Sequence, residues 1–403
     1  MTWTVKSGSA TLVSTFSVTN GNGTVSTGVK FGSTPGQVVI EVATASGIKA
    51  DFNLINNIVV SSVTAFSGSG QAALENQPFG NPLIVLVKDN NGNPVSGISV
   101  SWSVSSGSVT VGAASTNTGT NGQAQVSVNA GGAPGPAVIT ATAAGIQVFF
   151  NLTVKAPGPT VTATSFVNAA SGIVGMVPCG LGTLTGPGIA VGIQGVISGI
   201  SPFGPLPFTL GGFSMTVNNV QAPIQAIANI NGIQQVNYQS PCETQPGNAT
   251  VVVNANGATT TVTNVPVFAA QPGIFTFAGA NGKNYAAIQS ATNGSYVTPT
   301  NFAVRGQTYY VYVTGLNQTT PALVTDSAGI PNQNVNLQAI VAINGVGVPV
   351  VSAQAQEGEI GSYVIGFQIP LTAATGADQP FTVGVIVNGQ NNPSLTVLIG
   401  GIQ

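Results

Sequence analysis

The stretch Trp102-Ser-Val-Ser-Ser-Gly-Ser-Val109 decides the fold class, because it repeats the earlier stretch Trp3-Thr-Val-Lys-Ser-Gly-Ser-Ala10. The match extends outward from these tryptophans through Asn22-Gly23 with Asn121-Gly122, Pro35-Gly36 with Pro134-Gly135, and Phe52-Asn-Leu54 with Phe150-Asn-Leu152. A repeat of about one hundred residues has the size of one β-sandwich module. Residues 1–56 therefore correspond to residues 100–154, and the first copy has no counterpart of roughly residues 57–99.

The shortened first copy predicts that β-strands from elsewhere complete it. In the second copy the missing part supplies the predicted strands Ile58–Thr64 and Leu83–Lys88. Without such strands the first copy would expose apolar faces and unpaired edges. The strands come either from an upstream segment of the same protein or from a neighbouring subunit that donates them. Residues 1–6 have no signal-peptide features, so we expect a mature or truncated chain.

The composition points to self-association and away from catalysis. Only 7 basic and 9 acidic residues occur among 403, whereas about one-quarter of an ordinary soluble domain is charged. A net charge of −2 gives no electrostatic basis for binding nucleic acid, and weak mutual repulsion suits a chain that packs against itself. There is no histidine, so the usual histidine-dependent nucleophiles and zinc sites are excluded. We predict no enzymatic activity, no metal and no cofactor.

Short alternating runs bounded by Gly, Asn, Pro and Asp predict β-strands throughout. In the second copy these runs are Ile58–Thr64, Leu83–Lys88, Ile98–Val104, Ala124–Val128, Ala137–Thr142 and Val148–Val154. The most apolar stretch, residues 172–200, contains Pro178, Pro187 and frequent glycines, so we predict no membrane span. The predicted fold class is all-β, with tandem immunoglobulin-like β-sandwich domains.

Two turns in the second copy carry a resemblance to a known family. Asp89-Asn-Asn-Gly-Asn-Pro-Val-Ser-Gly97 precedes the tryptophan strand, and Thr120-Asn-Gly-Gln-Ala124 follows it. Both resemble the bacterial immunoglobulin-like (Big) domains of invasin- and intimin-type surface proteins, although Asn121 stands where that family usually has Asp. The resemblance covers residues 57–155 well and residues 1–56 as a half copy. It implies a spacer or an adhesive stalk.

A second pair of repeats follows the proline-rich segment 156–160. Its matching stretches are Thr216–Val220 with Ala342–Val346, Val236–Pro241 with Ile365–Pro370, and Val251–Gly257 with Val383–Gly389. We therefore expect a partial module at 1–56, a complete module at 57–155, a linker at 156–160 and two β-sandwiches at 161–270 and 271–403.

This second pair also resembles a family. The stretches that carry the resemblance are Val167-Asn-Ala-Ala-Ser171, Leu206-Pro-Phe-Thr-Leu-Gly-Gly212, the run from Val217 to Pro241, and Ala270-Gln-Pro-Gly-Ile-Phe275. Residues 163–403 resemble the uncharacterised C-terminal domain family of Solibacter-type acidobacterial secreted proteins. Pro178-Cys179-Gly180 replaces the family's Pro-Gly-Ser turn, and residues 186–205 look like an enlarged variable loop. The resemblance implies a secreted β protein and no known activity.

The chain has two cysteines, Cys179 and Cys242, and each follows a proline. Both belong to the first of the two C-terminal repeats, and Leu371 occupies the position that matches Cys242. Two cysteines in a chain of secreted character favour a disulfide. A pair of free thiols is the alternative, whereas a metal or redox pair lacks the Cys-x-x-Cys spacing and a histidine partner.

Three further features have a structural and a chemical interpretation. Glu357 and Glu359 share a strand face if the segment is extended, which would suit a glycosidase pair or a cation site, but we favour a solvated turn. Asp89 to Asn93 resembles the start of a calcium loop, but Pro94 follows and the closing glutamate is missing, so we favour a hairpin turn. Trp3 and Trp102 occupy equivalent positions, which favours core residues over a sugar platform.

Our leading hypothesis is a non-enzymatic, secreted bacterial protein that forms or extends an extracellular fibre or surface stalk and associates with its own copies. The alternative is an adhesive or carbohydrate-binding module of a larger secreted protein. The number of exposed aromatic side chains distinguishes the two, because a sugar platform needs a row of exposed Trp or Tyr and the chain has only 2 Trp and 7 Tyr.

Overall fold

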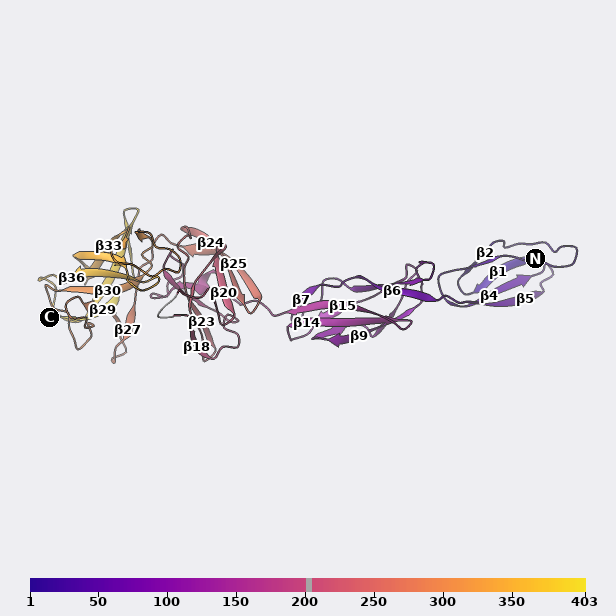
Figure 1. Cartoon of the computed structure of the whole chain (residues 1–403), viewed down its shortest axis with the longest axis horizontal. Coiled ribbons are helices and arrows are strands. Elements are labelled where there is room, and N and C mark those ends of the chain that lie inside the picture. The colour runs from indigo at the N-terminus through magenta and orange to yellow at the C-terminus, as the bar shows by residue number, and fades with distance from the viewer. Residues whose placement is uncertain (201–204) are drawn as a thin grey trace. The chain divides into compact units, whose positions relative to one another are not determined.

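The computed structural model describes residues 1–200 and 205–403, which form β-strands and one short 3₁₀ helix, η1 (Ala163–Ser165). They divide into two compact units, residues 1–157 and residues 158–403 (Figure 1). The all-β fold class predicted from the sequence is confirmed. Within the described ranges no helix is long and apolar enough to cross a membrane.

Residues 57–155 form a sandwich of two sheets around one core. The first sheet has the strand order β11 (Ser115–Asn117), β9 (Ser99–Ser106), β14 (Gly135–Ala143), β15 (Ile146–Lys155) and β7 (Ala72–Leu74). The second has the order β12 (Gln123–Val126), β8 (Leu83–Asp89) and β6 (Val60–Ser67), and β10 (Val109–Val111) pairs with β13 (Val128–Ala130).

Alternation of side chains along these strands builds the core. Leu83, Val85 and Val87 of β8 are fully buried, because alternate residues of a strand point to the same face. They share one hydrophobic cluster with Trp102 and Phe150 of the opposite sheet, whose rings lie 6.0 Å apart. The core role predicted for Trp102 is confirmed.

Residues 1–56 form a smaller arrangement with the same local order. One sheet contains β1 (Thr2–Ser7), β4 (Gly36–Ala43) and β5 (Lys49–Asn56), and the other contains β2 (Ala10–Leu12) and β3 (Val29–Phe31) (Figure 1). Trp3 is 7% exposed, so the core role predicted for it is also confirmed.

The described part of the second unit, residues 158–200 and 205–403, contains four sheets. The first has the strand order β16 (Phe166–Asn168), β17 (Leu181–Thr185), β23 (Ile233–Gln239), β22 (Ile224–Ile230) and β18 (Gly195–Ser198). The second has the order β19 (Thr209–Leu210), β20 (Phe213–Val217), β24 (Gly247–Ala255) and β25 (Ala258–Val267), with β21 (Val220–Gln221) beside β20.

The other two sheets contain the following strands. One has β26 (Gly273–Ile274), β30 (Thr308–Thr314), β36 (Tyr363–Gln368), β35 (Val350–Ala355), β32 (Asn334–Val335) and β31 (Thr319–Thr320), with β29 (Ile288–Ser290) beside β30. The last has β27 (Thr276–Ala278), β28 (Asn284–Ala286), β39 (Val397–Ile402), β37 (Gly376–Val387), β33 (Gln338–Ile343) and β34 (Val346–Val348), with β38 (Gln390–Pro393) beside β37.

The segment 186–205, expected to be a variable loop, contains the edge strand β18. All four residues of β18 are exposed, so its sequence lacks the alternating pattern that predicts a strand. Its backbone pairs with residues 226–229 of β22. Residues 201–204 of the segment lie outside the described residues.

Among the residues that the structure describes, buried hydrophobic side chains gather in four clusters. Their members run from Trp3 to Val42, from Val63 to Val154, from Val161 to Val267, and from Ala270 to Ile402. Cys179 and Cys242 belong to the last cluster although both precede residue 270.

Candidate functional site

Residues 1–56 form about half of a sandwich. Strands β1, β4 and β5 are the counterparts of β9, β14 and β15 in the complete module, and β2 and β3 are those of β10 and β13. Among the described residues 1–56 no strand takes the places of β6, β7 and β8. The counterpart of β12, residues 24–27, is not a strand, because the strand that β12 pairs with in the complete module has no equivalent here.

The inner face of this half-module is open over β5. Phe52 of β5 is 50% exposed, whereas its equivalent Phe150 is fully buried. The two phenylalanines occupy the same place, since Phe52 lies 5.9 Å from Trp3 and Phe150 lies 6.0 Å from Trp102. The difference therefore comes from the covering sheet and not from the position of the ring.

The outer face of the same sheet carries the charges. Lys6 Nζ lies 2.8 Å from Asp51 Oδ2 and 3.7 Å from Glu41 Oε2, and Lys49 Nζ lies 2.8 Å from Glu41 Oε1. The hydrogen bond to Asp51 raises the pKa of Lys6 above its ordinary value. The outer face thus carries a solvent-exposed network of ion pairs. The alternate residues that face inward on β1, β4 and β5 are uncharged.

Strand β5 also has a free edge. In the complete module the equivalent strand, β15, pairs in parallel with β7 through residues 153–155. Strand β5 pairs with β4 on one side, and it ends the sheet on the other. An edge of eight residues with unpaired backbone groups is a template for strand addition.

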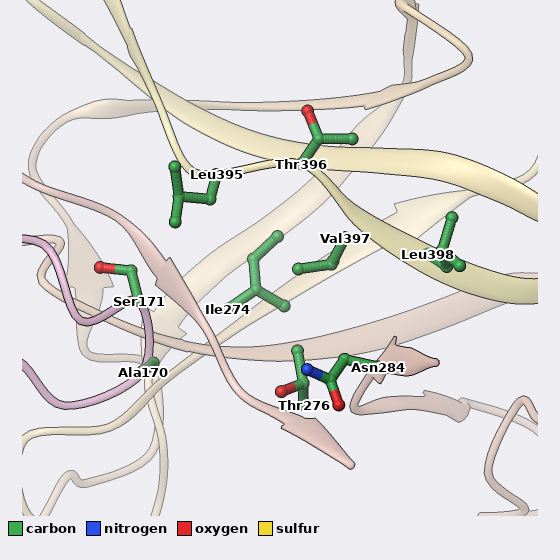
Figure 2. Close-up of a pocket in the computed structure, with 9 residues that line it drawn as sticks. All are labelled: Ala170, Ser171, Ile274, Thr276, Asn284, Leu395, Thr396, Val397 and Leu398. Atoms are coloured by element: carbon green, nitrogen blue, oxygen red, sulfur yellow. The ribbon is translucent and has the colours of Figure 1, made fainter. Parts of the chain in front are cut away.

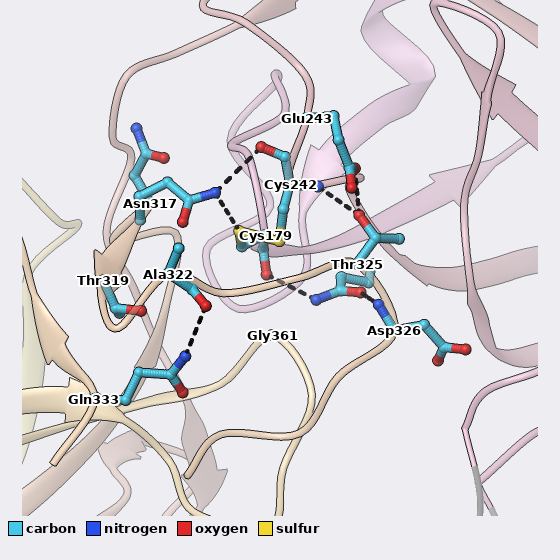
Figure 3. The surroundings of a disulfide bond; sticks show 12 residues. Cys179, Cys242, Glu243, Asn317, Thr319, Ala322, Thr325, Asp326, Gln333 and Gly361 are labelled. Atoms are coloured by element: carbon cyan, nitrogen blue, oxygen red, sulfur yellow. Dashed lines mark hydrogen bonds between the residues drawn. A yellow bond between two sulfur atoms is a disulfide. The ribbon is translucent and has the colours of Figure 1, made fainter. Parts of the chain in front are cut away.

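Cys179 and Cys242 are bonded to each other in the structure (Figure 3). Their Cα atoms are 4.3 Å apart, within reach of a disulfide. Cys179 is fully buried and Cys242 is 7% exposed, and both pack among side chains of the last sandwich. The bond therefore lies where the two C-terminal sandwiches meet, which the sequence did not predict.

Polar side chains of the last sandwich surround this disulfide. Gln318 Nε2 donates to Cys179 Sγ and to the carbonyl oxygen of Cys242, each at 3.3 Å. The backbone N–H of Cys242 donates to Thr325 Oγ1 at 2.8 Å, and that hydroxyl donates to Glu243 Oε2 at 2.5 Å. Gln318 and Thr325 lie far from both cysteines in the chain, so local sequence patterns contain no signal for these contacts.

Asp326 forms a second link across the same junction. Its Oδ1 accepts the backbone N–H of Leu206 at 2.7 Å, and its own N–H donates to Oε1 of the buried Gln239 at 2.8 Å. Partial burial raises the pKa of Asp326 above its ordinary value, against the opposing effect of the Leu206 hydrogen bond. The two C-terminal sandwiches are thus joined by packing, a disulfide and hydrogen bonds.

A cavity of about 340 Å³ lies beside the same pair of sandwiches (Figure 2). Its lining consists of small and aliphatic side chains with three hydroxyls and one amide, from Ala170, Ser171, Ile274, Thr276, Asn284, Leu395, Thr396, Val397 and Leu398. This lining contains no titratable side chain, so it holds no acid or base beside its three hydroxyls.

The remaining sequence candidates are structural. Glu357 and Glu359 are exposed at a turn. Asp89 Oδ1 accepts the backbone N–H groups of Asn91 and Asn93 at 2.9 and 2.8 Å, which closes a hairpin turn and lowers the pKa of Asp89. In the part of the chain that the structure describes, no three acidic or cysteine residues lie together as a metal site would require.

Residues 65–157 match the family model described as bacterial Ig-like domain (group 1). The resemblance of the complete module to Big domains is confirmed for this stretch. The resemblance of residues 163–403 to the acidobacterial family stays a prediction. No curated protein matches the chain.

Several solved structures of bacterial surface proteins are similar to the chain. Invasin, titled a bacterial integrin-binding protein, has 13% identity and a TM-score of 0.30, and the match covers 99% of this chain and 71% of invasin. An intimin fragment solved with the intimin-binding domain of its receptor has 16% identity, a TM-score of 0.29, and coverage of 60% and 70%. Domains 4 and 5 of the S-layer protein SbsC have 21% identity, a TM-score of 0.21, and coverage of 30% and 65%. These similarities concern the fold alone.

Proposed function

We propose that the protein is a secreted, non-enzymatic bacterial structural protein, a subunit of an extracellular fibre or surface stalk. The observation that carries this proposal is the half-module that residues 1–56 form, in a chain that also contains complete immunoglobulin-like sandwiches. Its half-exposed Phe52 and unpaired β5 edge form a surface that strands of a neighbouring subunit can complete.

A second surface supports self-association. Val196 of the edge strand β18 and Ile230 and Ile233 at the β22–β23 turn are 60%, 52% and 69% exposed. Val196 pairs with Ala228 and Ile230 pairs with Ile233, so the three side chains lie on the outer face of one sheet near its edge. An assembly that grows beyond a closed pair needs at least two such surfaces on each subunit.

The disulfide supports a location outside the cytoplasm, because structural disulfides persist in oxidising compartments. The tryptophans that a carbohydrate platform would use are buried, which favours the structural role over sugar binding. We also propose four domains, 1–56, 57–155, 161–270 and 271–403, a division that the four core clusters support.

Electron microscopy of the purified full chain tests the proposal. We expect filaments or regular multimers whose number rises with protein concentration, and we expect Ile233→Asp to shorten them because it places a charge on the β18–β22 surface. Single dispersed chains at all concentrations would contradict a self-assembling role.

A further inference from the structure

We propose that the last sandwich binds an uncharged, extended polysaccharide, such as a β-linked glucan, through tyrosines on the outer face of one sheet. The strands that form this face are β29, β30, β36 and β35, which pair in this order; Figure 1 labels the first three. The inference goes beyond the proposed structural role and does not rest on it, because it concerns other residues.

The tyrosines of the chain fall into two groups. Four are buried, namely Tyr238, Tyr285, Tyr309 and Tyr363. The other three are Tyr296, which is 49% exposed, Tyr310, which is 36% exposed, and the half-buried Tyr312. Burial raises the pKa of Tyr312, and the neighbouring phenols of Tyr296 and Tyr310 raise it further, so the three rings lie close together.

Strand pairing places two of these tyrosines in one row across the sheet. Gln289 of β29 pairs with Tyr296 on one side and with Tyr310 of β30 on the other. Tyr310 pairs in turn with Gly366 of β36, and Gly366 pairs with Ser352 of β35. Side chains that stand directly opposite each other on antiparallel strands point to the same face. The row is therefore a straight line of residues on the outside of the sandwich.

Contacts within the face hold the rings in place. Tyr312 lies on the same face as Tyr310, two residues along β30, and its hydroxyl donates to Gln289 Oε1 at 2.5 Å. Gln289 Nε2 donates to the carbonyl oxygen of Gly294, also at 2.5 Å. A Cβ on Gly366 would lie 3.3 Å from Cε1 of Tyr310, so the edge of that ring reaches over the glycine. The absence of a side chain at position 366 thus leaves room for a flat aromatic surface.

The chemistry of this face matches an uncharged sugar chain. Aromatic rings pack against the apolar C–H faces of sugar rings, while hydroxyl and amide groups beside them bind sugar hydroxyls. Two strand spacings separate Tyr296 from Tyr310 by roughly 9.6 Å, which is wider than one sugar ring, so they contact different units of one extended chain. None of the residues of β29, β30, β35 and β36 is charged, so an acidic polysaccharide would find no cationic partner on these strands.

A groove continues the surface at the Ser352 end of the row. Its volume is about 480 Å³, and its lining comes from β33, β34 and β35. The lining is uncharged and includes Gln338, Val348 and Ser352. Because Ser352 belongs both to the row and to the groove, a polysaccharide that crosses the sheet can extend into the groove.

Calorimetric titration of the full chain with cellohexaose tests the inference, with hexagalacturonate as the charged comparison. We expect cellohexaose alone to bind. Tyr296→Ala and Tyr310→Ala should each weaken binding by about tenfold, because each removes one aromatic contact, whereas Tyr310→Phe keeps the ring and should bind like the wild type. Phe149→Ala is the matched control, because it removes a 57% exposed aromatic side chain from the first unit and should leave binding unchanged.

A measurement on the unsubstituted chain covers the case in which an alanine substitution unfolds the sandwich. Tetranitromethane nitrates accessible tyrosines, and mass spectrometry locates the modified residues. We expect nitration of Tyr296 and Tyr310 in the free protein and protection of both by cellohexaose. The buried tyrosines should stay unmodified in either case.

Three results would overturn the inference. The first is a failure of the wild type to bind cellohexaose, or tighter binding of hexagalacturonate. The second is wild-type affinity in the double variant Tyr296→Ala, Tyr310→Ala. The third is protection of these tyrosines on concentrating the protein without sugar, which would assign the face to contacts between copies of the chain.

Discussion

Replacing both Cys179 and Cys242 by alanine is expected to destabilise the second unit alone. The two residues are 63 positions apart, and cross-linking a loop of this length lowers the entropy of the unfolded chain enough to stabilise the fold by about 4 kcal/mol. At a urea dependence of about 3 kcal/mol per molar, the unfolding midpoint falls by roughly 1.3 M.

The aromatic residues allow the two units to be followed separately. Trp3 and Trp102 both lie in residues 1–157, whereas all seven tyrosines lie in residues 158–403. Tryptophan fluorescence therefore reports the first unit, and the near-ultraviolet circular dichroism of tyrosine is weighted toward the second. We expect the tyrosine transition to move to lower urea and the tryptophan transition to stay in place.

Two results would refute the reasoning. A tyrosine transition that does not move would mean that the bond does not constrain the unfolded chain. An equal shift of the tryptophan transition would mean that residues 1–157 depend on a bond that the structure places outside them. The wild type treated with a reductant strong enough to open the bond is the matched control, because it keeps both sulfur atoms.

Three further predictions concern single substitutions and the measurements that follow them. Phe150→Ala should lower the free energy of unfolding by about 3–5 kcal/mol. Phe52→Ala should lower it by roughly half as much in dilute protein, because half of the Phe52 surface is already in water. Urea unfolding, followed by the fluorescence of the adjacent tryptophan, measures both changes. Hydrogen bonds from a lysine and a tyrosine lower the pKa of Asp378 below its ordinary 3.8, so the stability that this carboxylate contributes is present above that pH and lost as the pH falls through the folded-state pKa; acid titration of Asp378→Asn should lack this loss. Gly315→Ala and Gly345→Ala place a side chain at a similar positive φ, of 80° and 76°, but only at position 315 would the added Cβ meet a backbone oxygen, at 2.2 Å; thermal unfolding should show about 2 kcal/mol more destabilisation at 315.

Much of the complete module could be predicted from its sequence, because its longer strands alternate and its turns contain Gly, Asn and Pro. The predicted strand Leu83–Lys88 is observed as Leu83–Asp89, and Ala137–Thr142 as Gly135–Ala143. Strands β7, β10 and β11 were missed because each has only three residues, too few to establish a period of two.

The surroundings of the disulfide could not be predicted in this way. Gln318 lies 139 residues from Cys179, and Thr325 lies 83 residues from Cys242. A contact between two sandwiches depends on which edges meet, and local periodicity contains no information on that. The one sequence signal was the asymmetry of the repeats: the cysteines occur in the first copy, and Leu371 stands at the matching place in the second.

The scarcity of charge makes the position of each charge informative. Four of the 16 charged residues lie on the outer face of one small sheet, where they pair with one another. From residue 156 to residue 240 there is no charged residue, and this range contains the exposed side chains of Val196, Ile230 and Ile233. Both surfaces proposed for self-association are thus free of charge, whereas the face opposite the open half-module is kept in water by its ion pairs. Removing water costs little free energy at the two uncharged surfaces and much at the face that carries the ion pairs. The distribution of charge therefore selects which faces of this chain can meet.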